Sequence, residues 1–136
     1  MQKSDVLHLL NQKVRLFSKE LNEYVQQHEL YASQWTILYV LTKRGPMTQT
    51  EIWKYLQVEA PTVTRTLTRM EKKGWVKRIS GQDKRERIIV LTETAETMLP
   101  EIQDSVKAFE ERFAGSLTEK EQIELYRLLE KLGTDR

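Results

Sequence analysis

The chain has 136 residues, of which 39% are hydrophobic and 31% charged, with a net charge of +2 and no cysteine. This profile excludes a disordered chain, and the missing cysteine excludes disulfides, thiolate metal sites and thiol redox switches. No apolar run reaches membrane-spanning length and the polar start, Gln2-Lys3-Ser4-Asp5, is unlike a secretory signal, so we expect a cytoplasmic protein without a membrane partner.

Helical periodicity dominates the N-terminal third. Apolar residues spaced by three or four from Val6 to Val25 predict a long helix over residues 5–29, with Ser4 as its N-cap. Ser33 is expected to cap a second helix, which Gly45-Pro46 ends.

Two shorter helices and a hairpin are predicted next. Thr48 and Glu51 have the spacing of a capping box for a helix over 48–56, and a turn at 57–58 leads to a helix over 59–73. Pro61 suits the first turn of that helix because its missing N–H would be unpaired anyway. β-Branched runs at 75–79 and 88–91 flank a polar stretch and predict a hairpin.

The C-terminal part is again helical. Thr92 starts a fifth helix in which Pro100 should bend rather than end the helix, and Thr118 with Glu121 opens a sixth. The order α-α-α-α-β-β-α-α is mainly α with a small β-wing, a winged helix-turn-helix. We assign residues 33–92 to this lobe, and 1–30 and 93–136 to a helical dimerisation region, because the terminal helices carry more apolar surface than a short chain can cover.

Positive charge is concentrated in the centre of the chain. Residues 61–90 hold nine Lys/Arg and three acids, a net charge of +6, whereas the whole chain carries +2. A basic ribbon after a helix pair indicates a polyanionic ligand, most simply duplex DNA.

The helix over 59–73 is the predicted recognition helix for the major groove. At 100° per residue, Val63, Leu67 and Met70 face the core. Thr62, Thr64 and Arg65 are the candidates for base contacts, and further DNA contacts are expected from Thr48, Gln49, Pro61, Thr68, Arg69 and Lys72. A merely solvated basic face is the alternative. Four threonines, mediocre helix formers, argue against it.

The hairpin tip over 80–87 is a second candidate DNA contact. Lys84, Arg85 and Arg87 would reach the adjacent minor groove, and Asp83 could pair with Arg85 to hold its guanidinium. In isolation the same residues could form an ordinary soluble turn, but the upstream recognition helix favours the wing.

These segments resemble the MarR (multiple antibiotic resistance regulator) family. The resemblance rests on Glu59-Ala-Pro-Thr-Val-Thr-Arg-Thr-Leu-Thr-Arg-Met-Glu-Lys-Lys-Gly-Trp-Val-Lys-Arg and on the wing pattern Asp83-x-Arg85-x-x-x-Ile89-x-Leu91-Thr92. It implies an obligate homodimer on a palindromic operator, with Arg85 in the minor groove supported by Asp83. It also implies repression relieved by a small aromatic or anionic effector. Phe17, Tyr24, Trp35 and Tyr39 could line that site, although core packing explains these aromatics better.

The predicted function is therefore a sequence-specific DNA-binding transcriptional regulator, and a repressor is favoured. The alternative is a winged-helix module for protein interaction or non-specific, architectural DNA binding. An enzyme has little support, since we find no nucleophile with a base and no phosphate loop. No cofactor or metal is expected, because His8 and His28 lie on different sides of one predicted helix.

Overall fold

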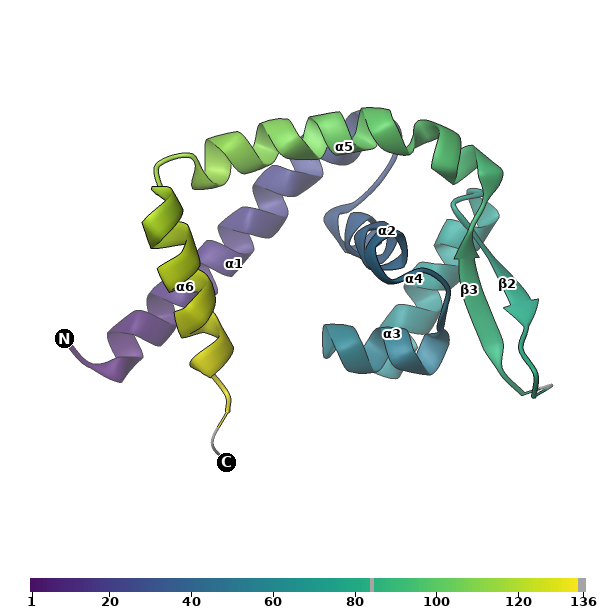
Figure 1. Cartoon of the computed structure of the whole chain (residues 1–136), viewed down its shortest axis with the longest axis horizontal. Helices are drawn as coiled ribbons and strands as arrows, with labels where there is room; N and C mark the ends of the chain where they lie inside the picture. Colours follow the sequence, from purple (N-terminus) through teal and green to yellow (C-terminus); the bar gives the residue numbers. More distant parts are fainter. Residues whose placement is uncertain (84, 135–136) are drawn as a thin grey trace.

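The computed structural model of the chain describes residues 1–83 and 85–134, and their fold is mostly helical with one small antiparallel sheet (Figure 1). The predicted fold class is confirmed. The helices are α1 (Lys3–Val25), the short 3-10 helix η1 (Gln26–His28), α2 (Ala32–Arg44), α3 (Gln49–Leu56), α4 (Ala60–Lys72), α5 (Glu93–Ala114) and α6 (Glu119–Lys131). The strands are β1 (Met47–Thr48), β2 (Val76–Ser80) and β3 (Arg87–Leu91). Each helix within the described ranges is too short or too polar to cross a bilayer.

The first helix is shorter than predicted at its C-terminal end. It ends at Val25, the chain tightens into η1, and Glu29 adopts a left-handed conformation with φ 60° that turns it towards α2. The prediction extended to residue 29 because His28 continues the spacing by three, but His28 lies in the 3-10 turn, with its Nε2 2.8 Å from Ser105 Oγ of α5.

Two predicted caps were wrong. The N-cap of α1 is Gln2 rather than Ser4, and that of α2 is Tyr31 rather than Ser33. At α2 the free backbone N–H groups are satisfied by other side chains: the Tyr31 N–H donates to Gln34 Oε1 at 3.1 Å and the Ala32 N–H donates to Asn22 Oδ1 at 2.5 Å. Gln34 of α2 and Asn22 of α1 thus supply the side-chain acceptors that were expected from Ser33.

The sheet has a strand that the sequence did not predict. β1 pairs with β3 through Met47 opposite Ile89, so the strand order is β1-β3-β2. The predicted hairpin of β2 and β3 is confirmed, with Val76 opposite Leu91 and Ser80 opposite Arg87. β1 joins the base of the wing to the start of α3 and so fixes both to one sheet.

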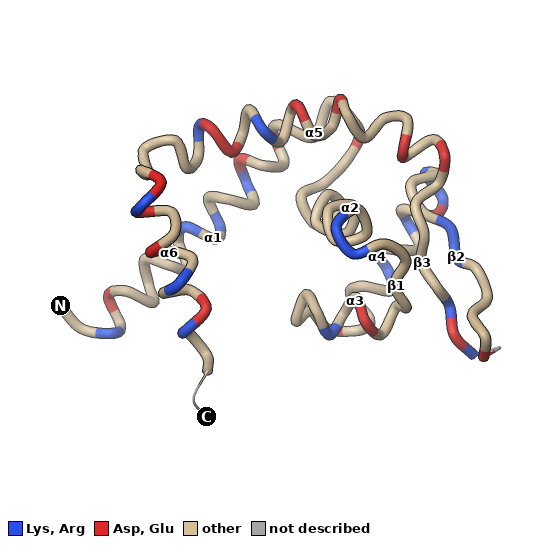
Figure 2. The backbone as a smooth tube through the Cα atoms, viewed as in Figure 1, with Lys and Arg blue, Asp and Glu red and all other residues tan. Residues whose placement is uncertain are grey.

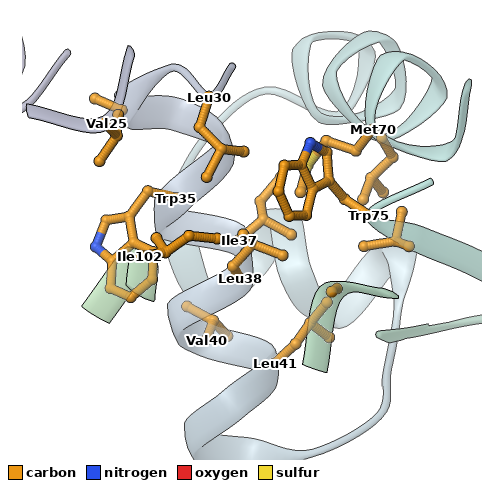
Figure 3. Close-up of a cluster of buried hydrophobic side chains, with 14 of the residues drawn as sticks. Val25, Leu30, Trp35, Ile37, Leu38, Val40, Leu41, Met70, Trp75 and Ile102 are labelled. Carbon is orange, nitrogen blue, oxygen red and sulfur yellow. The ribbon is translucent and has the colours of Figure 1, made fainter. Parts of the chain in front are cut away.

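The core centres on α2, which lies between α4, the sheet and α5 (Figure 3). Leu38 on α2, Leu67 and Met70 on α4, and Ile102 on α5 are fully buried. Val63 is also buried, so the predicted inward face of α4 is confirmed. This packing fixes the orientation of α4 and thereby the direction of its opposite face.

Helix α5 connects the lobe formed by α2–α4 and the sheet to the terminal helices (Figure 1). It packs along α1 and continues through Pro100, as predicted. At its start the Thr92 hydroxyl donates to the Gly74 carbonyl at 2.5 Å and accepts from the Ala95 N–H at 3.1 Å. This one cap therefore ties α5 to the end of α4.

The capping box of α3 gives a stability prediction. The Thr48 hydroxyl accepts from the Glu51 N–H at 3.1 Å, and the Thr48 N–H donates to Glu51 Oε1 at 3.0 Å. The backbone hydrogen bond from Thr48, and then that from its side chain, lower the pKa of Glu51 below 4.5. Because this pKa is lowered in the folded state, the Glu51 contribution is present above about pH 4.5 and is lost as the pH falls below it.

We expect Thr48→Ala to lower the free energy of unfolding by about 1 kcal/mol at pH 7, and by less at pH 3. Denaturant unfolding of both chains at the two pH values measures this, with the exposed neighbour Thr50→Ala as control. An equal loss at both pH values would show that the reciprocal contact with Glu51 adds no stability.

Candidate nucleic-acid interface

Helices α3 and α4 form a helix-turn-helix with a tight connection. Gln57 adopts a left-handed conformation with φ 56° and ends α3, and the Val58 N–H donates to the Trp53 carbonyl at 3.2 Å. Pro61 lies in the first turn of α4, as the sequence predicted. The second helix of the pair is thereby held across the first, with its N-terminal half exposed.

The outer face of α4 carries the predicted residues. Thr62, Thr64, Arg65 and Lys72 are exposed, as are Pro61 and Arg69, while Thr68 is half-buried. The orientation predicted from helical periodicity is therefore observed, whereas the contact of each side chain with DNA stays a prediction.

The side chains of this face are organised by hydrogen bonds. Gln49, the first residue of α3, donates from Nε2 to Thr64 Oγ1 at 2.5 Å. Arg65 donates to Thr62 Oγ1 at 3.4 Å. Gln49 and Thr64, both predicted site residues 15 positions apart, are thus brought together on one surface.

Arg78 is a residue of this surface that the sequence did not single out. Its guanidinium donates to Glu71 Oε1 at 3.3 Å and to Thr68 Oγ1 at 3.4 Å, so it connects β2 to α4. Its only signal in the sequence was its positive charge, because the partners lie 7 and 10 positions away on a different element. This contact fixes the wing relative to the recognition helix.

The wing tip shows one contact of Asp83 that the sequence did not predict. The Asp83 carboxylate accepts from the backbone N–H of Arg85 at 3.0 Å, and the Glu86 N–H donates to the Asp83 carbonyl at 2.9 Å. Asp83 thus shapes the backbone of the turn, whereas its pairing with the Arg85 guanidinium stays a prediction. A two-residue separation favours this local bond, since aspartate readily accepts from an N–H two residues on. Lys84, also predicted here, lies outside the described residues.

Arg69 on the last turn of α4 and Lys73, the C-cap of that helix, lie beside the α1–α2 connection. Lys73 Nζ donates to the Glu29 carbonyl at 3.3 Å. Arg69 borders a pocket of about 350 Å³ between α1, α2 and α4, which is lined by Ser18, Asn22, Tyr31, Ala32, Ser33, Gln34, Thr66 and Arg69. The sequence did not predict this pocket, because its lining comes from three helices.

The four aromatic residues predicted to line an effector site fall into two groups. Phe17 and Tyr24 make edge contacts with Phe109 on α5, with ring centroids 5.2 and 5.7 Å apart. Trp35 and Tyr39 neighbour each other on α2, with centroids 6.2 Å apart. Trp35 is buried and Tyr39 exposed. Within this chain, packing accounts for Phe17, Tyr24 and Trp35, and an effector role for these residues stays a prediction.

The two histidines have separate surroundings. His8 is exposed on α1, whereas His28 lies on η1 with Nε2 2.8 Å from Ser105 Oγ of α5. His28 therefore joins η1 to α5. In residues 1–83 and 85–134, no three His, Asp or Glu side chains come close enough to share a metal ion.

Charge is distributed unevenly over the elements (Figure 2). Basic residues occur on α4, along β2 and towards the wing tip, while acidic residues recur along α5. The positive side chains of α4 and of the wing thus belong to the elements that Arg78 joins.

A three-stranded sheet, two crossed helices and a wing held to the second helix define a winged helix-turn-helix protein. The chain belongs to the MarR family: residues 30–86 match that family. It is 48% identical over 117 residues to the uncharacterized HTH-type transcriptional regulator YwoH of Bacillus subtilis (strain 168), covering 86% of this chain and 85% of that protein.

Further similarities extend over almost the whole chain. YpoP of Bacillus subtilis (strain 168), also an uncharacterized HTH-type transcriptional regulator, is 31% identical and covers 97% of this chain and 94% of its own. A cysteine-to-serine mutant of MarR from E. coli, complexed with operator DNA, has a TM-score of 0.81 and 29% identity, covering 95% and 91% of the two chains. Reduced AbfR bound to DNA has a TM-score of 0.78 and 26% identity, covering 94% and 90%.

Proposed function

We propose that this protein is a transcriptional repressor that binds double-stranded DNA sequence-specifically, as a homodimer on a palindromic operator. The observation that carries the proposal is the outer face of α4, where Arg65 is exposed, Gln49 of α3 contacts Thr64, and Arg78 of β2 contacts Thr68. Similar folds of the same family are bound to DNA in the E. coli MarR and AbfR complexes.

In this proposal α4 enters the major groove and the wing enters the adjacent minor groove. Arg65 can form a bidentate contact with guanine, and Lys72 and Arg69 can neutralise phosphates. Arg85 projects from the tip towards the minor groove, where narrow A·T-rich segments attract arginine. Thr48 lies at the N-terminus of α3, where first-turn N–H groups suit a phosphate.

The proposed dimer is supported by apolar side chains that the single chain leaves exposed. On α1 they include Val6, Leu9 and Val14, and on α6 with its C-cap they are Ile123, Leu125, Tyr126, Leu128, Leu129 and Leu132. Two-fold symmetry would place the two α4 helices about 34 Å apart, one turn of DNA, which is why a palindromic operator is proposed.

A small aromatic or anionic effector that releases the protein from DNA is part of the proposal. The support is the presence of Phe17, Tyr24, Trp35 and Tyr39, of which Tyr39 is the most exposed. Calorimetric titration with aromatic carboxylates, followed by measurement of DNA affinity, tests this point.

The decisive experiment is fluorescence anisotropy with the protein's own upstream DNA and with scrambled DNA across a salt series. We expect the logarithm of the affinity to fall steeply with the logarithm of salt, and a preference of about 10³-fold or more for the upstream site. Salt-dependent binding without preference would indicate an architectural role. No binding near physiological salt would favour a protein-interaction module.

Arg85→Ala is expected to weaken operator binding by about 1–2 kcal/mol without affecting folding, since the side chain is exposed at the tip. Anisotropy on the operator and thermal unfolding measure the two effects. Gln82→Ala, at another exposed position of the tip, is the control. An unchanged affinity would remove the wing from the proposed interface.

A further inference from the structure

Three of the four threonine hydroxyls on α4 donate hydrogen bonds to backbone carbonyls of the same helix. Thr64 donates to the Ala60 carbonyl at 3.0 Å, Thr66 to that of Thr62 at 3.0 Å, and Thr68 to that of Thr64 at 2.9 Å. A hydroxyl has one proton, so each of these oxygens can only accept a further hydrogen bond. As arranged here, none of the three can donate to a base.

The hydroxyl oxygen of Thr64 already accepts a hydrogen bond from the side-chain amide of Gln49. Because Thr64 has no proton left to give, the amide must present Nε2 to it rather than Oε1, so the contact defines which way the amide faces. No second side-chain hydrogen bond of Gln49 occurs within residues 1–83 and 85–134. Its Oε1 and its other N–H are therefore available to a ligand.

We propose that Gln49 is a specificity-determining residue that reads an adenine in the major groove, and that Thr64 is the residue that positions it. This inference rests on the proposed DNA-binding function. Because Gln49 contacts Thr64, its side-chain amide lies on the exposed face of α4, and Thr64 directly precedes Arg65 in the sequence. A side chain on that face meets base edges, whereas the body of the first helix crosses the DNA backbone.

The chemistry of the free amide edge favours adenine over a phosphate. Adenine offers a donor at N6 and an acceptor at N7, which match Oε1 and the remaining N–H of Gln49. A phosphate oxygen only accepts and would leave Oε1 unpaired. Thr64 also holds the amide in one orientation before binding, which reduces the side-chain entropy that a free glutamine would lose.

Selection of bound duplexes from a randomised library tests the proposal, using the full chain and the variants Gln49→Ala and Gln49→Glu. With Gln49→Ala we expect the preference for adenine at one position of each half-site to fall by about 5- to 100-fold, with the other positions unchanged. With Gln49→Glu the preference there should move towards cytosine, because a carboxylate accepts from cytosine N4. Two variants of different chemistry keep the test valid if one folds poorly, which circular dichroism reports.

Two Thr→Val variants distinguish a role of Thr64 in positioning Gln49 from a role in helix stability alone. Thr64→Val keeps the shape but removes the oxygen that holds Gln49, and we expect a weaker adenine preference at the same position. Thr66→Val is the matched control, since Thr66 makes the same bond within the helix but has no contact with Gln49. It should select the same sequence as the unaltered chain.

Replacing that adenine by 7-deazaadenine removes the N7 acceptor alone. It should weaken binding of the unaltered chain about tenfold and leave the Gln49→Ala affinity unchanged. An equal loss on all sequences for Gln49→Ala would overturn the inference in favour of a phosphate contact, and an unchanged selected sequence would overturn it outright. If the unaltered chain selects no sequence, the proposed function itself fails, so the two failures are distinguishable.

Discussion

Leu125→Glu together with Leu129→Glu is expected to convert the protein into a folded monomer that binds its operator about 10²–10⁴-fold more weakly. Both leucines lie on one side of α6 and are 43% and 44% exposed in the single chain. Charged residues at these positions would cost little in a monomer but would be buried without a partner in a dimer. The affinity falls because a monomer binds one half-site only. In a dimer, binding of the first subunit holds the second subunit close to the other half-site, and this gain is lost.

The reason to place the dimer contact on α6 is that this helix lacks packing of its own. It has 13 residues and no extensive contact with another element in the described part of the chain. Isolated helices of that length are marginal in water, even with a capping box such as that of Thr118 and Glu121. We therefore expect the apolar side of α6 to pack against a partner. The exposed side chains of α1 form a second apolar surface against which it can pack.

Sedimentation velocity measures the association state, and anisotropy on the palindromic site and on an isolated half-site measures binding. Arg127→Ala is the matched control, because Arg127 lies on the opposite side of α6 in an exposed ion pair with Glu124. The control should remain dimeric. A double glutamate variant that stays dimeric would contradict the proposed interface, while circular dichroism would identify a variant that unfolds.

The parts of the fold that followed from the sequence are those decided by neighbouring residues. Thr48, Thr92 and Thr118 each cap the helix that was predicted to follow, because a threonine side chain reaches only the next turn. The inward face of α4 was predictable for the same reason, since Val63, Leu67 and Met70 recur with the helical period.

Several of the errors arose where partners lie far apart in the chain. Asn22 caps α2 from another helix, and the two-residue strand β1 exists only because β3 lies beside it. A strand of two residues has no alternation from which to predict it. At the site, Gln49 is positioned by Thr64 and Arg78 by Thr68. The sequence therefore predicted most of the residues of this surface but not the hydrogen bonds between them.

Those connections make the interface one unit rather than three charged segments. Gln49 ties α3 to α4, Arg78 ties α4 to β2, and β1 ties the start of α3 to the sheet. A recognition helix supported on both sides presents its side chains in a fixed register. Such a surface is suited to recognising bases through individual side chains rather than to attracting DNA through charge alone.

Arg65→Ala tests that readout most directly, and we expect it to cost about 2–3 kcal/mol of operator binding and to abolish discrimination at one guanine of each half-site. Arg65 is exposed in the N-terminal half of α4, and its guanidinium is steered by Thr62 Oγ1 at 3.4 Å. A bidentate contact with guanine O6 and N7 would be lost completely, because alanine has no donor to replace it. Affinities for the operator and for single-base variants at that guanine, measured by anisotropy, give the discrimination.

Lys72→Ala provides the comparison, since Lys72 is exposed on the last turn of the same helix, away from the end that we propose enters the groove. A lysine on a phosphate should lower the affinity for all sequences alike and reduce the salt slope by about 1. Arg65→Ala should instead reduce the difference in affinity between the operator and its single-base variants. If both variants weaken every sequence equally, Arg65 contacts only the DNA backbone, and specificity must come from the other side chains of α4, from Gln49 or from the shape of the DNA.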